Sequence, residues 1–245
     1  MRIDMTGQVA IVTGAAHRVG RAIALELARA GVHVLVHYFR SPDEVVRETL
    51  HEVKSLGVDA FAVRADLSAP DGVEAIFAAA REHFGRLDIL VNSASNFQRR
   101  KLLDVTPDEW NETMSINLTA PFLCTQHAIR LMRAGSGGVI VNICDRGALE
   151  PWVDYAHHGI SKAGLLALTK VTAAGYGPDI RANAVIPGLV LKPEGMDEAR
   201  WQQYAQDTPL ARPGTAEDVG RAVVYLASED FVTGAVLHVD GGSMV

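Results

Sequence analysis

The stretch QVAIVTGAAHRVG, residues 8–20, decides the fold class because an apolar run passes directly into a turn bounded by glycines. The run is short and rich in valine and isoleucine, which predicts a buried strand. The turn begins at Gly14 and ends at Gly20, and apolar residues then recur every three or four positions through residues 20–31, as in a helix. A strand that passes through such a turn into a helix is typical of a phosphate-binding site at the helix N-terminus.

The same alternation of short apolar runs and longer amphipathic stretches continues along the chain. Six further runs predict strands at residues 32–38, 59–65, 87–93, 137–143, 180–186 and 235–241. Strands that alternate with helices form parallel sheets through right-handed crossovers, and helices cover both faces. The expected fold class is therefore α/β: a single Rossmann-like, doubly wound domain over residues 1–245, with a parallel sheet of about seven strands and helices on both faces.

The composition is that of an ordinary globular protein, with 245 residues, 48% of them hydrophobic and 21% charged. The formal net charge of −6, with no basic run longer than residues 99–101, argues against nucleic-acid binding. The N-terminal apolar run is too short for a signal peptide or a membrane span, so we expect a cytoplasmic protein that does not bind membranes. The histidines and cysteines lack metal-ligand spacing, so no metal site is expected, and Cys124 and Cys144 are expected to be buried.

One long irregular segment, residues 187–214, interrupts the pattern near the C-terminus. It contains four prolines and one short polar helical pattern. In a compact domain such a segment often covers a ligand site, although a plain surface excursion is the alternative. We expect a substrate lid at about residues 189–213.

The turn TGAAHRVG resembles that of the short-chain dehydrogenase/reductase family, which reads TGxxxGxG. This chain has Arg18 at the middle glycine, and arginine there is a mark of the pteridine reductase branch. The resemblance covers nearly the whole chain and implies a homotetramer, with the final GGSMV near a subunit interface. It continues through DLS at 66–68, NSAS at 92–95, Asn117 in SINLTAP, PG at 187–188 and FVTGAVLHVDGG at 231–242.

The end of the second predicted strand, HYFRS at residues 37–41, indicates which cofactor is bound. A cofactor without a 2′-phosphate is usually held there by an acidic residue, whereas a 2′-phosphate needs cationic or hydroxyl donors. Arg40 and Ser41 supply both, which favours NADPH over NADH. The residues expected to hold the cofactor are Gly14, His17, Arg18, Val19, Gly20, His37, Phe39, Arg40, Ser41, Asp66, Leu67, Asn92, Ser93, Ala94, Lys162, Pro187 and Gly188.

The stretch YAHHGISKAG, residues 155–164, contains the candidate proton donor. The family's YxxxK places its tyrosine four residues before Lys162, and His158 stands there in this chain, one turn away on the same helix face. Tyr155 lies seven residues before Lys162, about 10 Å along a helix, so it cannot take that place. Thirteen residues before His158 is Asp145, where the general family has serine and the pteridine reductases have aspartate. The expected catalytic residues are Asp145, His158, Lys162 and Asn117.

The segment NSASNF, residues 92–97, resembles the NNASSF of pteridine reductases, and a flat pterin would stack on Phe97. The expected substrate-binding residues are Arg18, Ser95, Phe97, Asp145 and His158. The resemblance therefore implies an NADPH-dependent reductase of a pteridine, such as a dihydropterin or dihydrofolate, in one-carbon metabolism. Two alternatives stay open: a general carbonyl or 3-oxoacyl reductase, and a catalytically silent NADPH-binding protein that lacks the active-site tyrosine.

Overall fold

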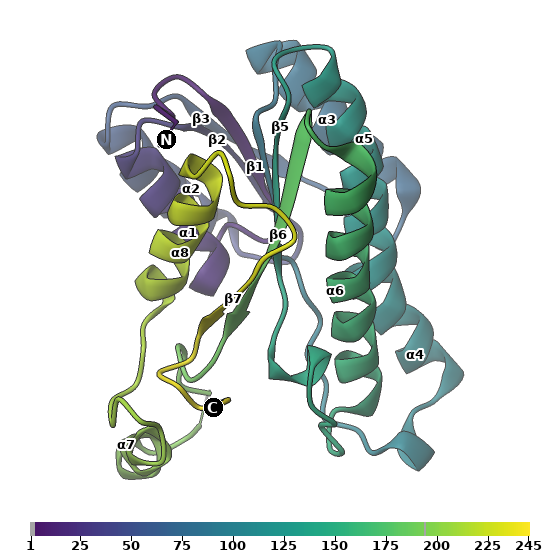
Figure 1. Ribbon diagram of the computed structural model, residues 1–245, viewed down its shortest axis with the longest axis vertical. Helices are drawn as coiled ribbons and strands as arrows, with labels where there is room; N and C mark the ends of the chain where they lie inside the picture. Colours follow the sequence, from purple (N-terminus) through teal and green to yellow (C-terminus); the bar gives the residue numbers. More distant parts are fainter. Residues whose placement is uncertain (1–2, 194) are drawn as a thin grey trace.

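One parallel sheet lies between two layers of helices in the computed structural model, which describes residues 3–193 and 195–245 (Figure 1). The sheet has seven strands in the order β3-β2-β1-β4-β5-β6-β7, and every neighbouring pair is parallel. The strands are β1 Val9–Val12, β2 His33–Tyr38, β3 Ala60–Arg64, β4 Ile89–Asn92, β5 Gly138–Ile143, β6 Ile180–Pro187 and β7 Val236–Val239. The expected doubly wound fold of about seven strands is confirmed, with most strand ends within one or two residues of the predicted ones.

The central strands form because their residues are apolar on both faces. All four residues of β1 are buried, and Val12 pairs in register with Val36 of β2 and Val91 of β4. A strand that is covered on both sides has no reason to alternate apolar and polar residues. This explains why the strands appear in the sequence as unbroken apolar runs.

The helices divide between the two faces of the sheet. In Figure 1, α1, α2 and α8 cover one face, and α3, α5 and α6 cover the other. Each face has its own apolar core, with Ile23 of α1 and Val223 of α8 in one, and Ile76 of α3 and Ile129 of α5 in the other. The helices are α1 Arg18–Arg29, α2 Asp43–Ser55, α3 Pro70–Phe84, α4 Pro107–Met114, α5 Ala120–Arg133, α6 Ala156–Tyr176, α7 Glu198–Gln206 and α8 Ala216–Ser228.

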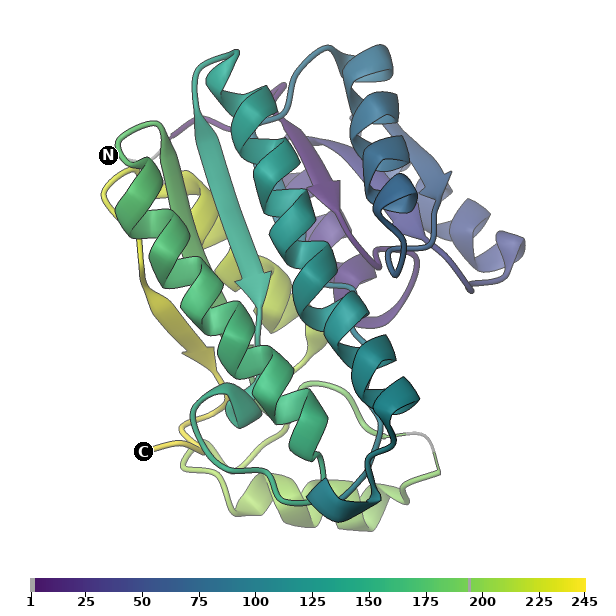
Figure 2. The same cartoon turned by 90° about the vertical axis from the view of Figure 1, so that its right-hand side faces the viewer.

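The order of the strands places the ligand site. The chain moves outward from β1 to β3 on one side and then returns to add β4 beside β1, so the direction of winding changes between these two strands. Doubly wound sheets bind ligands beyond the carboxyl ends of the strands at this point. Helix α7, within the segment expected to be a lid, crosses beyond the same ends of the strands (Figure 2).

No helix among the described residues is long and apolar enough to cross a lipid bilayer.

Candidate active site

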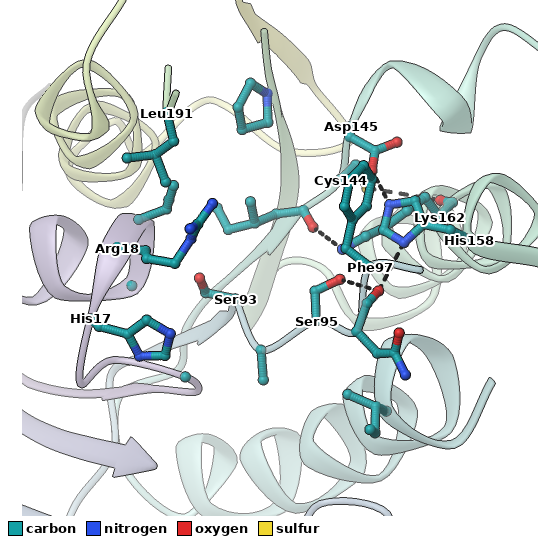
Figure 3. Close-up of a pocket in the computed structure, with 18 of the residues that line it drawn as sticks. His17, Arg18, Ser93, Ser95, Phe97, Cys144, Asp145, His158, Lys162 and Leu191 are labelled. Atoms are coloured by element: carbon teal, nitrogen blue, oxygen red, sulfur yellow. Dashed lines mark hydrogen bonds and ion pairs between the residues drawn. The ribbon is translucent and has the colours of Figure 1, made fainter. Parts of the chain in front are cut away.

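A cavity of about 1550 Å³ opens beyond the carboxyl ends of the strands, and it borders the change of direction between β1 and β4. Figure 3 shows His17 and Arg18 on one side of it and Asp145, His158 and Lys162 on the other. Pockets for one small ligand are usually about 300–1000 Å³. This cavity therefore has room for a dinucleotide and a second small molecule.

The turn between β1 and α1 needs its two glycines for different reasons. Gly14 has a φ of +66°, and a Cβ there would lie 3.0 Å from the Cα of Ala94. A Cβ on Gly20 would collide with the carbonyl group of Gly14. The backbone of this turn therefore requires glycine at both positions, as the sequence predicted.

Arg18 lies at the middle-glycine position and keeps a glycine-like backbone, with a φ of +56°. A non-glycine residue in this region is strained, and such strain is concentrated at ligand sites. The residue also begins α1 two positions earlier than the apolar pattern predicts. Its exposed side chain borders the cavity and has no ion-pair partner among the described residues.

His37 supports the turn from β2. Its Nδ1 accepts a hydrogen bond from the Gly14 N–H at 3.0 Å, and its Nε2 donates to the Ala65 carbonyl at 3.0 Å. Burial lowers the pKa of His37, although the Ala65 carbonyl and the charge of Asp66 act in the opposite direction. Both ring nitrogens are therefore used within the protein, and His37 shapes the cofactor cavity instead of offering it a hydrogen bond.

The far end of the cavity lies at the loop after β2. The Phe39 carbonyl accepts a hydrogen bond from Arg64 Nε at 3.2 Å, and the guanidinium of Arg40 lies over the Phe39 ring, 5.5 Å from its centroid. Arg40 is 79% exposed, and its guanidinium is 3.9 Å from a carboxyl oxygen of Glu112. Ser41 Oγ lies 3.0 Å from Nδ1 of His17. As predicted, this loop offers cationic and hydroxyl groups.

The candidate proton-transfer group is built by the loop after β5 and the first turns of α6. Nε2 of His158 is hydrogen-bonded to Oδ2 of Asp145, and Oδ1 of Asp145 accepts from the Gly147 N–H at 2.8 Å. Lys162, one turn further along α6, donates from Nζ to the Ile143 carbonyl at 2.9 Å. Three of the four residues expected to be catalytic thus lie together on the cavity wall.

The charges of this group depend on one another. Burial alone would raise the pKa of Asp145, but the hydrogen bond from His158 and the positive charge of Lys162 outweigh it and hold that pKa below its usual value. Burial lowers the pKa of Lys162, and the charge of Asp145 offsets part of this effect. Asp145 is therefore a carboxylate that both neighbours stabilise.

Asn117 lies behind His158 and does not border the cavity. It is fully buried in a π-helical turn between α4 and α5, where its Oδ1 accepts from the Asn96 N–H at 2.7 Å. Its Nδ2 donates to the Asn96 carbonyl at 3.0 Å and to Ser161 Oγ at 3.1 Å. These contacts hold the loop of Asn96 and the imidazole of His158 in place, and the catalytic role expected of Asn117 stays a prediction.

Asn92, expected to hold the cofactor, does not reach the cavity either. Its side chain points into the sheet and donates to Oδ1 of Asn142 at 2.8 Å, because it is the last residue of a strand that is buried on both faces. The other residues expected to contact cofactor or substrate all border the cavity, and they are Gly14, His17, Arg18, Val19, Gly20, His37, Phe39, Arg40, Ser41, Asp66, Leu67, Ser93, Ala94, Ser95, Phe97, Asp145, His158, Lys162, Pro187 and Gly188.

An aromatic cluster forms the wall beside His158. The ring of Phe97 is stacked on Tyr155 with centroids 4.4 Å apart and meets the His158 ring edge-on at 4.7 Å. Phe97 is 54% exposed and borders the cavity, whereas Tyr155 packs behind it as the residue before α6. The prediction that Tyr155 cannot replace the family's tyrosine agrees with this placement.

Several residues of the wall were not predicted. Sequence distance hides most of them, because α7, the C-terminal segment and the loop before α6 reach the site only through tertiary packing. Leu191, Tyr204 and Asp207 carried a signal, since they lie in the segment expected to be a lid. The unpredicted residues include Cys144, Arg146, Trp152, Leu191, Tyr204, Asp207, Asp240, Ser243 and Met244. Both cysteines are buried as expected, and burial raises the pKa of Cys144 to about 12.

The fold and this site define a nucleotide-dependent oxidoreductase of the doubly wound class, and comparison with known proteins agrees. The family model described as enoyl-(acyl carrier protein) reductase matches residues 14–244. The 3-oxoacyl-[acyl-carrier-protein] reductase of Staphylococcus aureus is 34% identical over 95% of this chain and 96% of its own.

Two solved structures are also similar. A short-chain dehydrogenase/reductase from Serratia marcescens has a TM-score of 0.91 and 31% identity, over 99% of this chain and 100% of its own. A blue fluorescent protein from a metagenomic library, in complex with NADPH, has a TM-score of 0.90 and 32% identity over the same shares. The chain belongs to the short-chain dehydrogenase/reductase family.

Proposed function

We propose that this protein is an NADPH-dependent reductase of a carbonyl group in a small organic substrate, with Asp145 and His158 as its source of protons. The observation that carries the proposal is the hydrogen-bonded pair of Asp145 and His158 beside Lys162, in the same cavity as the phosphate-binding turn. The similarity to a 3-oxoacyl reductase favours a carbonyl substrate over a pteridine.

The residues of the cavity fit a dinucleotide that carries a 2′-phosphate. The N-terminus of α1 and the glycine turn suit the pyrophosphate, and Arg40 and Ser41 suit the 2′-phosphate. Lys162 uses one N–H of its ammonium group on the Ile143 carbonyl, which leaves donors for ribose hydroxyl groups. NADPH supplies a hydride to the substrate when it is bound.

The hydrogen bonds around His158 indicate which atom faces the substrate. Asn117 Nδ2 has two hydrogens, and the Asn96 carbonyl and Ser161 Oγ accept both, because Ser161 gives its own hydrogen to the His158 carbonyl at 2.6 Å. Nδ1 of His158, 2.9 Å from the Asn96 carbonyl, therefore donates to that oxygen. Nε2 is bound to Asp145. The imidazole is used at both nitrogens and is only 2% exposed, whereas the Asp145 side chain is 20% exposed.

This arrangement gives each residue a role. A carbonyl oxygen that becomes an alkoxide must receive a proton. His158 in its charged form holds a proton on Nε2 against Oδ2 of Asp145, and the Asp145 carboxylate passes this proton on to the alkoxide. Water in the open cavity reprotonates the pair after the product leaves. Lys162 holds its positive charge beside Asp145, and Asn117 holds the loop of Asn96 against the imidazole.

A second candidate function, reduction of a pteridine, has its own supporting observation. Arg18 points into the cavity from a strained backbone, and the half-exposed ring of Phe97 offers a stacking surface beside Asp145. A planar ring rich in hydrogen-bond donors and acceptors suits this combination. The proposal also includes assembly as a homotetramer and a substrate lid at residues 189–213.

The test is oxidation of NADPH by the purified protein with three groups of substrates: ketones and aldehydes, 3-oxoacyl thioesters, and dihydropterins with dihydrofolate. Turnover of a carbonyl compound that Asp145→Asn abolishes supports the proposal. Turnover of dihydropterins alone would replace it with the second candidate. NADPH binding without turnover of any substrate would contradict both and favour the silent protein.

A further inference from the structure

His17 and Ser41 meet where the cavity is expected to receive the 2′-phosphate. Nδ1 of His17 is 3.0 Å from Ser41 Oγ, and both residues border the cavity beside Arg40. His17 is the residue before α1, has an extended backbone and does not cap the helix with its side chain. Among the described residues its Nε2 has no hydrogen-bond partner. The ring is therefore held at one nitrogen, and the other is available to a ligand.

The protonation state of His17 decides how many donors this corner offers. In the neutral ring with its hydrogen on Nε2, Nδ1 accepts the hydrogen of the Ser41 hydroxyl group, which is then occupied. In the charged ring, Nδ1 donates to Ser41 Oγ instead, so the hydroxyl hydrogen of Ser41 becomes free. Protonation thus adds a positive charge, and it gives a ligand the Ser41 hydroxyl in addition to Nε2–H.

The surroundings of His17 favour its neutral form when no anion is bound. Burial and the neighbouring charge of Arg18 hold the pKa of His17 below its usual value. Of the other groups near this corner, Arg21 is paired with Glu52 of α2, Arg40 is drawn toward Glu112 of α4, and Asp66 follows β3. A phosphate dianion against the ring favours the charged form, because an opposite charge nearby raises the pKa of a base.

On the basis of the proposed use of NADPH, we propose that His17 makes the preference for NADPH over NADH depend on pH. The imidazolium form of His17 leaves the Ser41 hydroxyl group free, and the two groups bind the 2′-phosphate together. Binding of NADPH then takes up a proton at His17. As pH rises through the raised pKa of the bound state, this proton is lost and the affinity for NADPH falls. The affinity for NADH, which has no 2′-phosphate, stays unchanged.

The experiment measures dissociation constants of NADPH and NADH by fluorescence titration between pH 6.5 and pH 8.5 at constant ionic strength. The 2′-phosphate itself titrates near pH 6, so it stays largely a dianion in this range. His17→Arg is the matched control because its charge does not titrate, and His17→Gln keeps a neutral side chain. We expect the dissociation constant of NADPH, divided by that of NADH, to rise about fivefold from pH 6.5 to pH 8.5 in the unmodified protein, a loss of about 1 kcal/mol of preference. It should stay within a factor of two in both variants.

Calorimetry in buffers of different ionisation enthalpy tests the same idea without a variant. The unmodified protein should take up protons when it binds NADPH near pH 7.5 and none when it binds NADH. A bound phosphate that loses a proton would release protons, so the sign identifies the histidine. The inference would be overturned if the ratio of the NADPH and NADH dissociation constants had the same pH dependence in the unmodified protein and in His17→Arg, or if NADPH binding took up no protons. Failure to bind NADPH at any pH would instead refute the proposed function.

Discussion

Oδ2 of Asp145 is hydrogen-bonded to Nε2 of His158, the residue one helical turn before Lys162. The family's pattern places a tyrosine where His158 stands and, in its general form, a serine where Asp145 stands. A serine and a tyrosine present two hydroxyl groups to a substrate. The pair in this protein instead presents a carboxylate that is hydrogen-bonded to a buried imidazole ring.

Asp145→Asn should lower the rate of carbonyl reduction by about 10²- to 10⁴-fold, the usual contribution of a positioned acid. Asparagine keeps the size of the side chain but cannot pass on a proton. The measurement is kcat from NADPH oxidation, with NADPH affinity as a check that the cavity is intact. Asp154→Asn is a matched control, because Asp154 pairs with Arg99 outside the cavity. Near-normal turnover by Asp145→Asn would show that another group supplies the proton.

His158→Tyr should move the pH dependence of turnover upward. A phenol keeps its proton to higher pH than an imidazolium does, so tyrosine remains an acid over a wider range. His158→Ala should lose the pH dependence together with most of the rate. The measurement is kcat against pH from 5.5 to 9.5 for all three proteins. Identical profiles of kcat against pH for the histidine and tyrosine proteins would show that residue 158 does not set the pH dependence of turnover.

The Asp145 carboxylate should also contribute to stability. Its pKa in the folded protein is below the usual value, so the contribution is complete above the ordinary carboxyl pKa and disappears as pH falls through the lowered one. Asp145→Asn should therefore be less stable than the unmodified protein at pH 7, and the difference should shrink below about pH 4. Thermal unfolding from pH 7 down to about pH 2.5 measures this, and a constant difference over that range would contradict it.

Arg40→Ala should reduce the preference for NADPH about tenfold, as expected for loss of one charge-assisted hydrogen bond to phosphate. The effect should be at the low end of the usual range, because Arg40 is 79% exposed and competes with Glu112 for its contact. Dissociation constants of NADPH and NADH measure the preference. Glu112→Gln should strengthen NADPH binding if that competition is real, and equal binding of both cofactors by the unmodified protein would remove the 2′-phosphate assignment.

The parts of the site that the sequence predicted lie close together in the chain. The turn from Gly14 to Gly20 joins one strand to one helix, and His158 and Lys162 share a helix face, so local geometry alone brings these residues together. The roles of Asn117 and Asn92 were not predictable in this way. Both are polar residues near the cavity. Only the direction of the side chain decides whether such a residue borders the cavity or lies behind its wall.

Phe97→Ala should distinguish the two candidate substrates. A pterin stacked on this ring would lose about 1 kcal/mol, which corresponds to roughly a fivefold rise in KM, with little effect on NADPH affinity. A small aliphatic ketone gains nothing from stacking, so its KM should change less. Phe97 also meets His158 edge-on, and part of the loss could come from a displaced imidazole. Phe97→Tyr controls for this, because it keeps the ring. If Phe97→Ala raised the KM of pterins and ketones equally and Phe97→Tyr left both unchanged, the ring would serve only to support the catalytic pair.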